Sequence, residues 1–183
     1  MGHIRNPSAV KLICGMIAAD ASVGAEAAFE LERLYGPIDL RSEWIPFTFS
    51  DYYRAEMGEC LMRQFVSFAE GIDAGRLGEI KLATNALEER FAADREGRPV
   101  RRVNLDPGYV TPAKLVLATT KDFAHRIYLG QGIFAEVTLN FTRQGCTFFN
   151  WTYPDYRTEP YTRFLREVRR MLLASAVQSP AAT

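Results

Sequence analysis

The run Val10-Lys-Leu-Ile-Cys-Gly-Met-Ile-Ala-Ala19 is apolar at nearly every position. A strand of this composition is usually buried on both faces, so we expect it at the centre of a sheet. Asp20 and Ser22 follow it directly, and their side chains are of the kind that caps helix N-termini. We therefore predict a helix over residues 23–35, which Gly36-Pro37 ends.

The first half of the chain continues the pattern that this strand and helix begin. We predict strands over 38–47, 61–68 and 100–106, a helix over 74–92, a loop or short helix over 49–58, and a surface turn over 94–99. The resulting order, β-α-β-β-α-β, is that of the ferredoxin-like fold. The fold class is therefore predicted to be α+β.

The second half is expected to extend this core. Asp106-Pro107-Gly108 predicts a turn, and Thr111-Pro112 is typical of a helix start, so a short helix is predicted over 112–119. The β-branched residues within this segment favour a strand instead. Gly130-Gln131-Gly132 predicts a hairpin between residues 125–129 and 133–142. An aromatic turn over 151–156 and a helix over 159–174 complete this C-terminal extension.

The whole chain, residues 1–183, is interpreted as one domain, with flexible tails over 1–8 and 175–183. Lys plus Arg and Asp plus Glu number 22 each, and this balance weighs against nucleic-acid binding, which needs a basic excess. Three scattered cysteines suggest reduced thiols. We find no signal peptide and no apolar run of about 18 residues, so a cytoplasmic protein without a membrane span is expected.

Several common sites are missing from the sequence. It contains no G-x-x-x-x-G-K-[ST], G-x-G-x-x-G, H-E-x-x-H or G-x-S-x-G motif. With one interior histidine, no zinc, haem or P-loop nucleotide site is expected, and no residue is assigned as a metal ligand. Mg²⁺ bound by Asp106 or Glu136 stays an open alternative, since this cation prefers carboxylate oxygens.

Strand alternation sorts the polar residues of the second half into faces. Asn104 and Asp106 share one face of their strand, Glu136 lies on a polar face of another, and Arg126 and Tyr128 share a face of a third. If these strands are neighbours, the carboxylates and the guanidinium converge in a cleft suited to acid/base chemistry or anion binding. The alternative is a sheet with one solvated face.

Two further side chains extend this candidate site. His125 titrates near neutral pH and is the natural general acid/base, or else a hydrogen-bonded structural histidine. Lys121 suits a phosphate or carboxylate, or else belongs to a solvated turn. Trp151, Tyr153 and Tyr156 could stack a base or sugar ring, or else pack on the core. The candidate catalytic residues are Asp106, His125 and Glu136, and the candidate ligand-binding residues are Asn104, Lys121, Arg126 and Tyr128.

A set of motifs in the same order resembles a known family. The motifs are Gly36-Pro37-Ile38-Asp39, Phe49-Ser50-Asp51-Tyr52-Tyr53, Glu56-Met57-Gly58, Val103-Asn104-Leu105-Asp106-Pro107-Gly108-Tyr109, Ala118-Thr119-Thr120-Lys121, His125-Arg126-Ile127-Tyr128-Leu129, Ala135-Glu136-Val137-Thr138-Leu139 and Trp151-Thr152-Tyr153-Pro154-Asp155-Tyr156. They resemble the DUF4416 family of bacterial and archaeal proteins over about residues 9–170. The resemblance implies a stand-alone small domain of uncharacterised function, and it carries over no catalytic residue.

Three functional hypotheses follow from these observations. The first is a protein that binds an anionic small molecule, such as a nucleotide or a phosphorylated metabolite, with or without acid/base chemistry. The second is a non-catalytic interaction or assembly module, which uses the sheet and exposed aromatic residues and could form a homo-oligomer. The third is RNA binding through an arginine patch, which the zero net charge disfavours.

Overall fold

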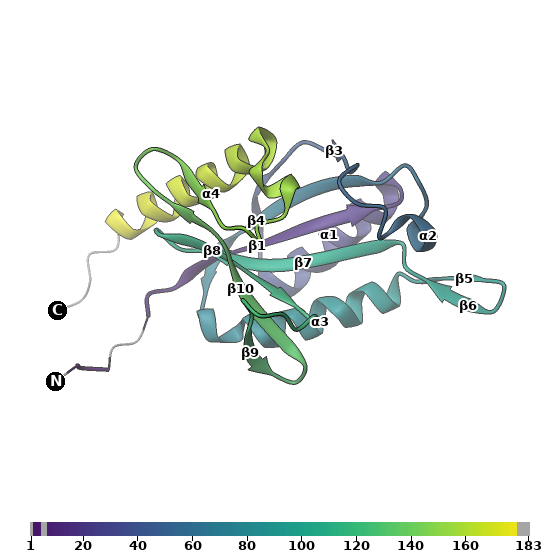
Figure 1. Cartoon of the computed structure of the whole chain (residues 1–183), viewed down its shortest axis with the longest axis horizontal. Helices are drawn as coiled ribbons and strands as arrows, with labels where there is room; N and C mark the ends of the chain where they lie inside the picture. Colours follow the sequence, from purple (N-terminus) through teal and green to yellow (C-terminus); the bar gives the residue numbers. More distant parts are fainter. Residues whose placement is uncertain (1, 5–6, 179–183) are drawn as a thin grey trace.

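An antiparallel sheet covered by helices organises the computed structural model, which describes residues 2–4 and 7–178 (Figure 1). The helical elements are α1 (Ala21–Tyr35), α2 (Arg54–Met57), α3 (Leu77–Arg90) and α4 (Glu159–Gln178), with short 3-10 turns η1 (Ala74–Arg76) and η2 (Pro154–Arg157). The strands are β1 (Val10–Ala18), β2 (Ile38–Arg41), β3 (Ile45–Pro46), β4 (Met62–Ile72), β5 (Ala93–Arg95), β6 (Arg98–Val100), β7 (Val103–Val110), β8 (Lys114–Thr119), β9 (Ile127–Gly130), β10 (Ile133–Phe141) and β11 (Cys146–Phe148). The predicted α+β class is thus confirmed.

The strands of the main sheet run in the order β11-β10-β8-β7-β1-β4-β2, with β3 beside β4 and β9 beside β10. Every pairing in this sheet is antiparallel. All nine residues of β1 are buried, and β1 lies between β4 and β7, as its continuous apolar run predicts. The separate β5–β6 hairpin projects from one end of the molecule (Figure 1).

Helices cover both faces of the sheet. One core joins β1, β4 and β7 to α1 and α3 through residues such as Leu31 and Ile80. A second core, on the other face, joins the sheet to α4 around Phe65, Tyr161 and Leu165. Figure 1 shows α4 on the opposite side of the sheet from α3. This double cover explains why a nearly continuous apolar strand is needed at the centre.

Two predicted elements of the second half were wrong. The segment predicted as a helix over 112–119 contains strand β8, because Leu115 and Leu117 pack toward α4 while Val116 and Ala118 pack on the other side. An alternation of this kind has the period of a strand. The turn predicted at Asp106-Pro107-Gly108 lies inside β7, which runs unbroken to Val110.

Other boundaries differ by smaller amounts. The strand predicted over 38–47 is divided into β2 and β3, and the turn predicted over 94–99 lies within the β5–β6 hairpin. The hairpin around Gly130-Gln131-Gly132 is confirmed. Helix α4 continues to Gln178, so residues 175–178 are helical where a flexible tail was expected. The remaining tail residues 1, 5–6 and 179–183 lie outside the described residues.

Candidate functional site

The sheet opens between β7 and β8. These two strands pair only over a short stretch, from Gly108 opposite Leu117 to Val110 opposite Leu115. Beyond it, β8 stays paired with β10, while the first half of β7 stays paired with β1. Pro107 lies at the point of separation, and a proline has no N–H to leave unpaired at an open edge. A cleft therefore forms at the position where hydrogen bonds between β7 and β8 would otherwise have closed the sheet.

Two side chains of α3 replace the missing strand at this edge. Glu88 Oε1 accepts a hydrogen bond from the backbone N–H of Leu105 (2.7 Å), and Lys81 Nζ donates to the carbonyl oxygen of Leu105 (2.6 Å). The two side chains lie 3.9 Å apart. Burial raises the pKa of Glu88 to about 7, although nearby Lys81 acts to lower it. The backbone at the opening is thus satisfied by ionisable side chains instead of by a neighbouring strand.

The cleft has a volume of about 650 Å³, within the range of small-molecule sites. Its walls come from α3, the start of β7, the end of β8 and the segment between β3 and β4. Polar and aromatic side chains dominate the lining. They include Tyr52, Tyr53, Glu56, Arg63, Lys81, Glu88, Arg101, Asn104, Asp106, Lys121, Arg126, Glu136, Tyr153, Asp155 and Tyr156.

A buried arginine forms the floor of the cleft. Arg63 on β4 lies 3.3 Å from the carboxylate of Asp106 and donates to the hydroxyl of Tyr156 (3.0 Å). Its side chain is only 3% exposed. Gly15, on the neighbouring strand β1, leaves space for the side chain of Arg63, because a Cβ at this position would lie 2.6 Å from Nη2 of the arginine. Asp106 is 27% exposed and completes an ion pair that reaches from the core to the cleft.

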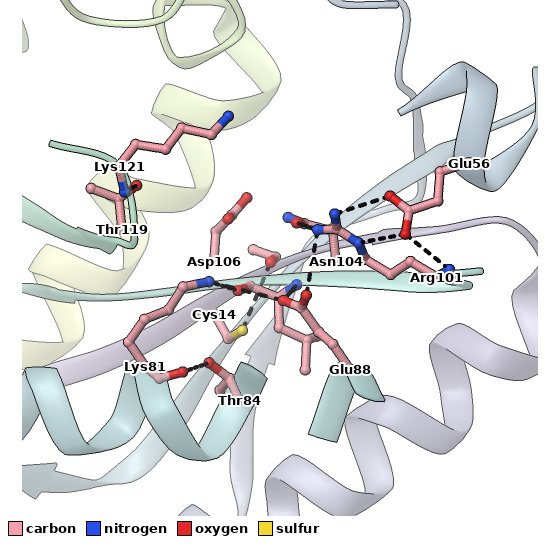
Figure 2. A network of polar contacts seen from close by, with 12 residues as sticks. Cys14, Glu56, Lys81, Thr84, Glu88, Arg101, Asn104, Asp106, Thr119 and Lys121 are labelled. Atoms are coloured by element: carbon pink, nitrogen blue, oxygen red, sulfur yellow. Dashed lines mark hydrogen bonds and ion pairs between the residues drawn. The ribbon is translucent and has the colours of Figure 1, made fainter. Parts of the chain in front are cut away.

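The wall beside α2 is a network around Arg101. This guanidinium contacts Glu56 (3.0 Å) and Glu88 (3.5 Å), and donates to Oδ1 of Asn104 (2.9 Å). The Nδ2 of Asn104 is buried and has no partner among the described residues. Figure 2 shows Asp106 projecting from β7 into the space between Lys121 on one side and Asn104 with Arg101 on the other. The floor and the two walls thus face a common space.

The opposite wall carries a second ion-pair group and a lysine. Glu136, 3% exposed, accepts from Nε of Arg126 (2.8 Å) and contacts Nε2 of His125 (3.1 Å). The ammonium of Lys121 lies 3.9 Å from the centre of the Tyr52 ring. No carboxylate lies within 4 Å of this ammonium in the part of the chain that the structure describes. Lys121 is therefore a cation at the cleft without an acidic partner.

The structure places the predicted site residues in two groups. Five of them line the cleft: Asn104, Asp106, Lys121, Arg126 and Glu136. The other two lie outside the lining. His125 stacks on the ring of Trp151 and contacts the cleft through Glu136. Tyr128 is 61% exposed on the β9 hairpin, where its hydroxyl accepts from the N–H of Gly132.

Sequence reasoning missed the residues that come from β4 and α3. Arg63 is the one charged residue of the strand predicted over 61–68, and a charge in a buried strand usually has a partner. Lys81 and Glu88 lie seven positions apart and so fall on one side of α3, next to its apolar face. Both signals are visible in the sequence, but neither says which distant segment they meet.

No metal-binding cluster is apparent in the described parts of the chain, since no three His, Cys, Asp or Glu side chains come together there. None of the helices described is both long and apolar enough to cross a membrane.

The fold and the cleft define the class: a mixed α+β protein whose antiparallel sheet opens into a polar cleft of small-molecule size. The chain belongs to the family described as a domain of unknown function, DUF4416, whose family model matches residues 8–172. The resemblance seen in the motifs is thereby confirmed over nearly the whole chain. No curated protein and no solved structure matches this chain.

Proposed function

We propose that this protein binds an anionic small molecule, such as a nucleotide or a phosphorylated metabolite, in the cleft between β7 and β8. The observation that carries the proposal is the unpaired ammonium of Lys121 at the cleft, in contact with the Tyr52 ring. A cation of this kind attracts a phosphate or carboxylate, and the aromatic ring beside it offers a stacking surface.

The charges of the remaining lining argue for a small ligand instead of a nucleic acid. The lining contains five basic and six acidic side chains. Asp106, Glu56, Glu88 and Glu136 each lie within 4 Å of a basic partner. A surface with this balance lacks the basic excess that phosphate-backbone binding requires. RNA binding is therefore the weaker hypothesis for this cleft.

Thermal denaturation with a panel of anions tests the proposal. The panel contains inorganic phosphate, sugar phosphates and nucleotides, and a ligand at about 100 times its Kd should stabilise the protein by about 2.7 kcal/mol. Lys121→Ala should weaken binding, while Lys114→Ala, a lysine outside the cleft lining, should not. If no anion stabilises the protein, or if both variants bind as tightly as the wild type, the cleft is not an anion site.

An interaction module is a second candidate, favoured by one observation at the β9 edge. Ile127, Tyr128 and Leu129 are 69%, 61% and 45% exposed, on a strand that pairs with β10. Exposed apolar side chains on an edge strand are typical of association sites. Light scattering over a range of concentrations tests this candidate with Ile127→Lys as the variant. A monomer at every concentration would count against self-association.

We also infer that the central part of the sheet is ferredoxin-like. The support is its connectivity: β4 lies between β1 and β2, which α1 connects, and β1 lies between β4 and β7, which α3 connects. Two interleaved units of this kind make the split β-α-β pattern. Strands β8 to β11 and helix α4 then form the C-terminal extension. An experimental structure in which α1 and α3 cover opposite faces would overturn this assignment.

A further inference from the structure

We propose that the ligand of the cleft is a nucleoside monophosphate whose base carries an exocyclic amino group. Its phosphate would bind Lys121, and the N–H donors of its base would bind Asp106. The inference rests on the proposed function, because it takes the cleft between β7 and β8 as the binding site. It goes further by naming which ligand the chemistry of the walls selects.

The first argument is the number of cations left for the ligand. Four of the five basic residues that line the cleft lie within 4 Å of a carboxyl group. These pairs are Arg63–Asp106 (3.3 Å), Lys81–Glu88 (3.9 Å), Arg101–Glu56 (3.0 Å) and Arg126–Glu136 (2.8 Å). Lys81, whose partner Glu88 has the raised pKa, is also buried and donates to the carbonyl oxygen of Leu105. Lys121 has no such partner among the described residues. One free ammonium matches one terminal phosphate, whereas di- and triphosphates are usually held by several cationic groups.

The second argument is the acceptor character of Asp106. Its Oδ2 faces Arg63, and its side chain is 27% exposed toward the cleft (Figure 2). No hydrogen bond to Oδ1 occurs among the described residues. A carboxylate in an ion pair only accepts hydrogen bonds, so a ligand that meets this oxygen must present N–H or O–H donors. An exocyclic amino group supplies such a donor, and a keto oxygen at the same place would meet a like partial charge.

The third argument concerns the shape of the ligand. Tyr52 and Tyr53 line the cleft with their rings at 88° to one another and 5.0 Å apart, and Tyr153 lines it from the other wall. Tyr52 and Tyr153 are 59% and 48% exposed, so ring surface is available for contact. Aromatic rings bind planar bases by stacking and tolerate any base, which leaves the choice between bases to hydrogen bonds. A planar base fits these walls better than a puckered sugar.

Matched nucleotide pairs test the inference on the wild-type protein. CMP differs from UMP, and AMP from IMP, in carrying an amino group in place of a keto oxygen. Hydrogen bonds to charged groups are strong enough that we expect about tenfold tighter binding of CMP and AMP. AMP should also bind at least as tightly as ATP. Isothermal titration calorimetry measures all of these affinities without any variant.

Two variants assign the ends of the ligand. Lys121→Ala should weaken the binding of CMP by about tenfold and leave the affinity for the nucleoside cytidine unchanged, because cytidine has no phosphate. Lys114→Ala should change neither affinity. Asp106→Asn should bring the affinity for UMP up to or above that for CMP, because an amide can donate to a keto oxygen. This ratio of affinities does not depend on the fraction of the variant that is folded.

The outcomes separate this inference from the function on which it rests. If phosphorylated compounds bind in a manner that depends on Lys121, but UMP binds as tightly as CMP or ATP binds more tightly than AMP, the ligand class is wrong and the anion site stands. If no anionic compound binds, both proposals are wrong. Preference for amino bases that persists in Asp106→Asn would overturn the role given to Asp106.

Discussion

The carboxyl group of Glu88 should make the stability of this protein fall as the pH rises toward neutrality. Burial raises its pKa from an ordinary value of 4.5 to about 7. An acid with a higher pKa in the folded state keeps its proton there over a range in which the unfolded chain has lost it. The contribution of protonated Glu88 to the free energy of unfolding is therefore fully present below about pH 4.5 and is lost as the pH rises to about 7.

The size of this effect follows from the same two pKa values. Because each tenfold change in an equilibrium is worth about 1.4 kcal/mol, the full loss is about 3 kcal/mol. About 2.5 kcal/mol of it falls between about pH 5 and about pH 8. Glu88→Gln keeps an oxygen that can accept from the N–H of Leu105 but removes the ionisation. The variant should lose none of this free energy over the same range.

Urea denaturation followed by circular dichroism at the two pH values measures the difference. Glu89→Gln is the matched control, since Glu89 is the next residue of α3 and is exposed. Other groups titrate over this range in all three proteins, so the comparison between variants isolates Glu88. If wild type and Glu88→Gln lose the same free energy, burial does not raise the pKa of Glu88 and the reasoning is refuted.

Two further predictions concern β1 and α1. Gly15→Ala should lower the free energy of unfolding by about 1–3 kcal/mol, because its methyl group would lie 2.6 Å from Nη2 of Arg63; Gly78→Ala, whose nearest contact is 3.6 Å, should cost nothing in the same urea assay. A tolerated Gly15→Ala would show that Arg63 can move. Asp20 accepts from the N–H of Val23 (2.9 Å), which lowers the pKa of Asp20 to about 2, so Asp20→Ala should cost about 1 kcal/mol at neutral pH. Acid titration should show wild type losing this advantage as the pH falls toward 2, and equal stabilities at neutral pH would contradict the cap.

The elements with strong local signals were predictable from the sequence. The apolar run of β1 and the Asp20 cap of α1 depend on neighbouring residues only, and both appear in the structure within two residues of the prediction. The hairpin of β9 and β10 is likewise specified by the glycines between its strands. Each of these features is decided within one short segment of chain.

Elements whose conformation depends on distant partners were not predictable in the same way. Thr111-Pro112 has the chemistry of a helix start, but β8 is a strand because its two faces meet α4 and α3, which lie far away in the chain. Pro107 indicated a turn because the sequence does not show that β7 is paired with β1 at this residue but has no partner there on its β8 side. Tertiary context therefore overrode the local signal at both positions.

The candidate site was predictable on the β7 wall and on the wall of Lys121, Arg126 and Glu136, but not on its floor or its α3 wall. Strand alternation placed Asn104 and Asp106 on a common face, and the structure has both in the cleft lining. The floor and the α3 wall depend on Arg63, Lys81 and Glu88, whose contacts join separate parts of the chain. Nothing in the local pattern specifies these long-range contacts.

The central position of β1 also bears on the order in which the chain can fold. During synthesis β1 is made before β7, and one of its edges is covered only when β7 follows, more than 80 residues further along the chain. Pairings between strands so distant in sequence form slowly, and until then the apolar edge of β1 is open to association with other chains. We therefore expect a fragment that ends before Val103 to aggregate in a sedimentation assay, while the full chain stays in solution.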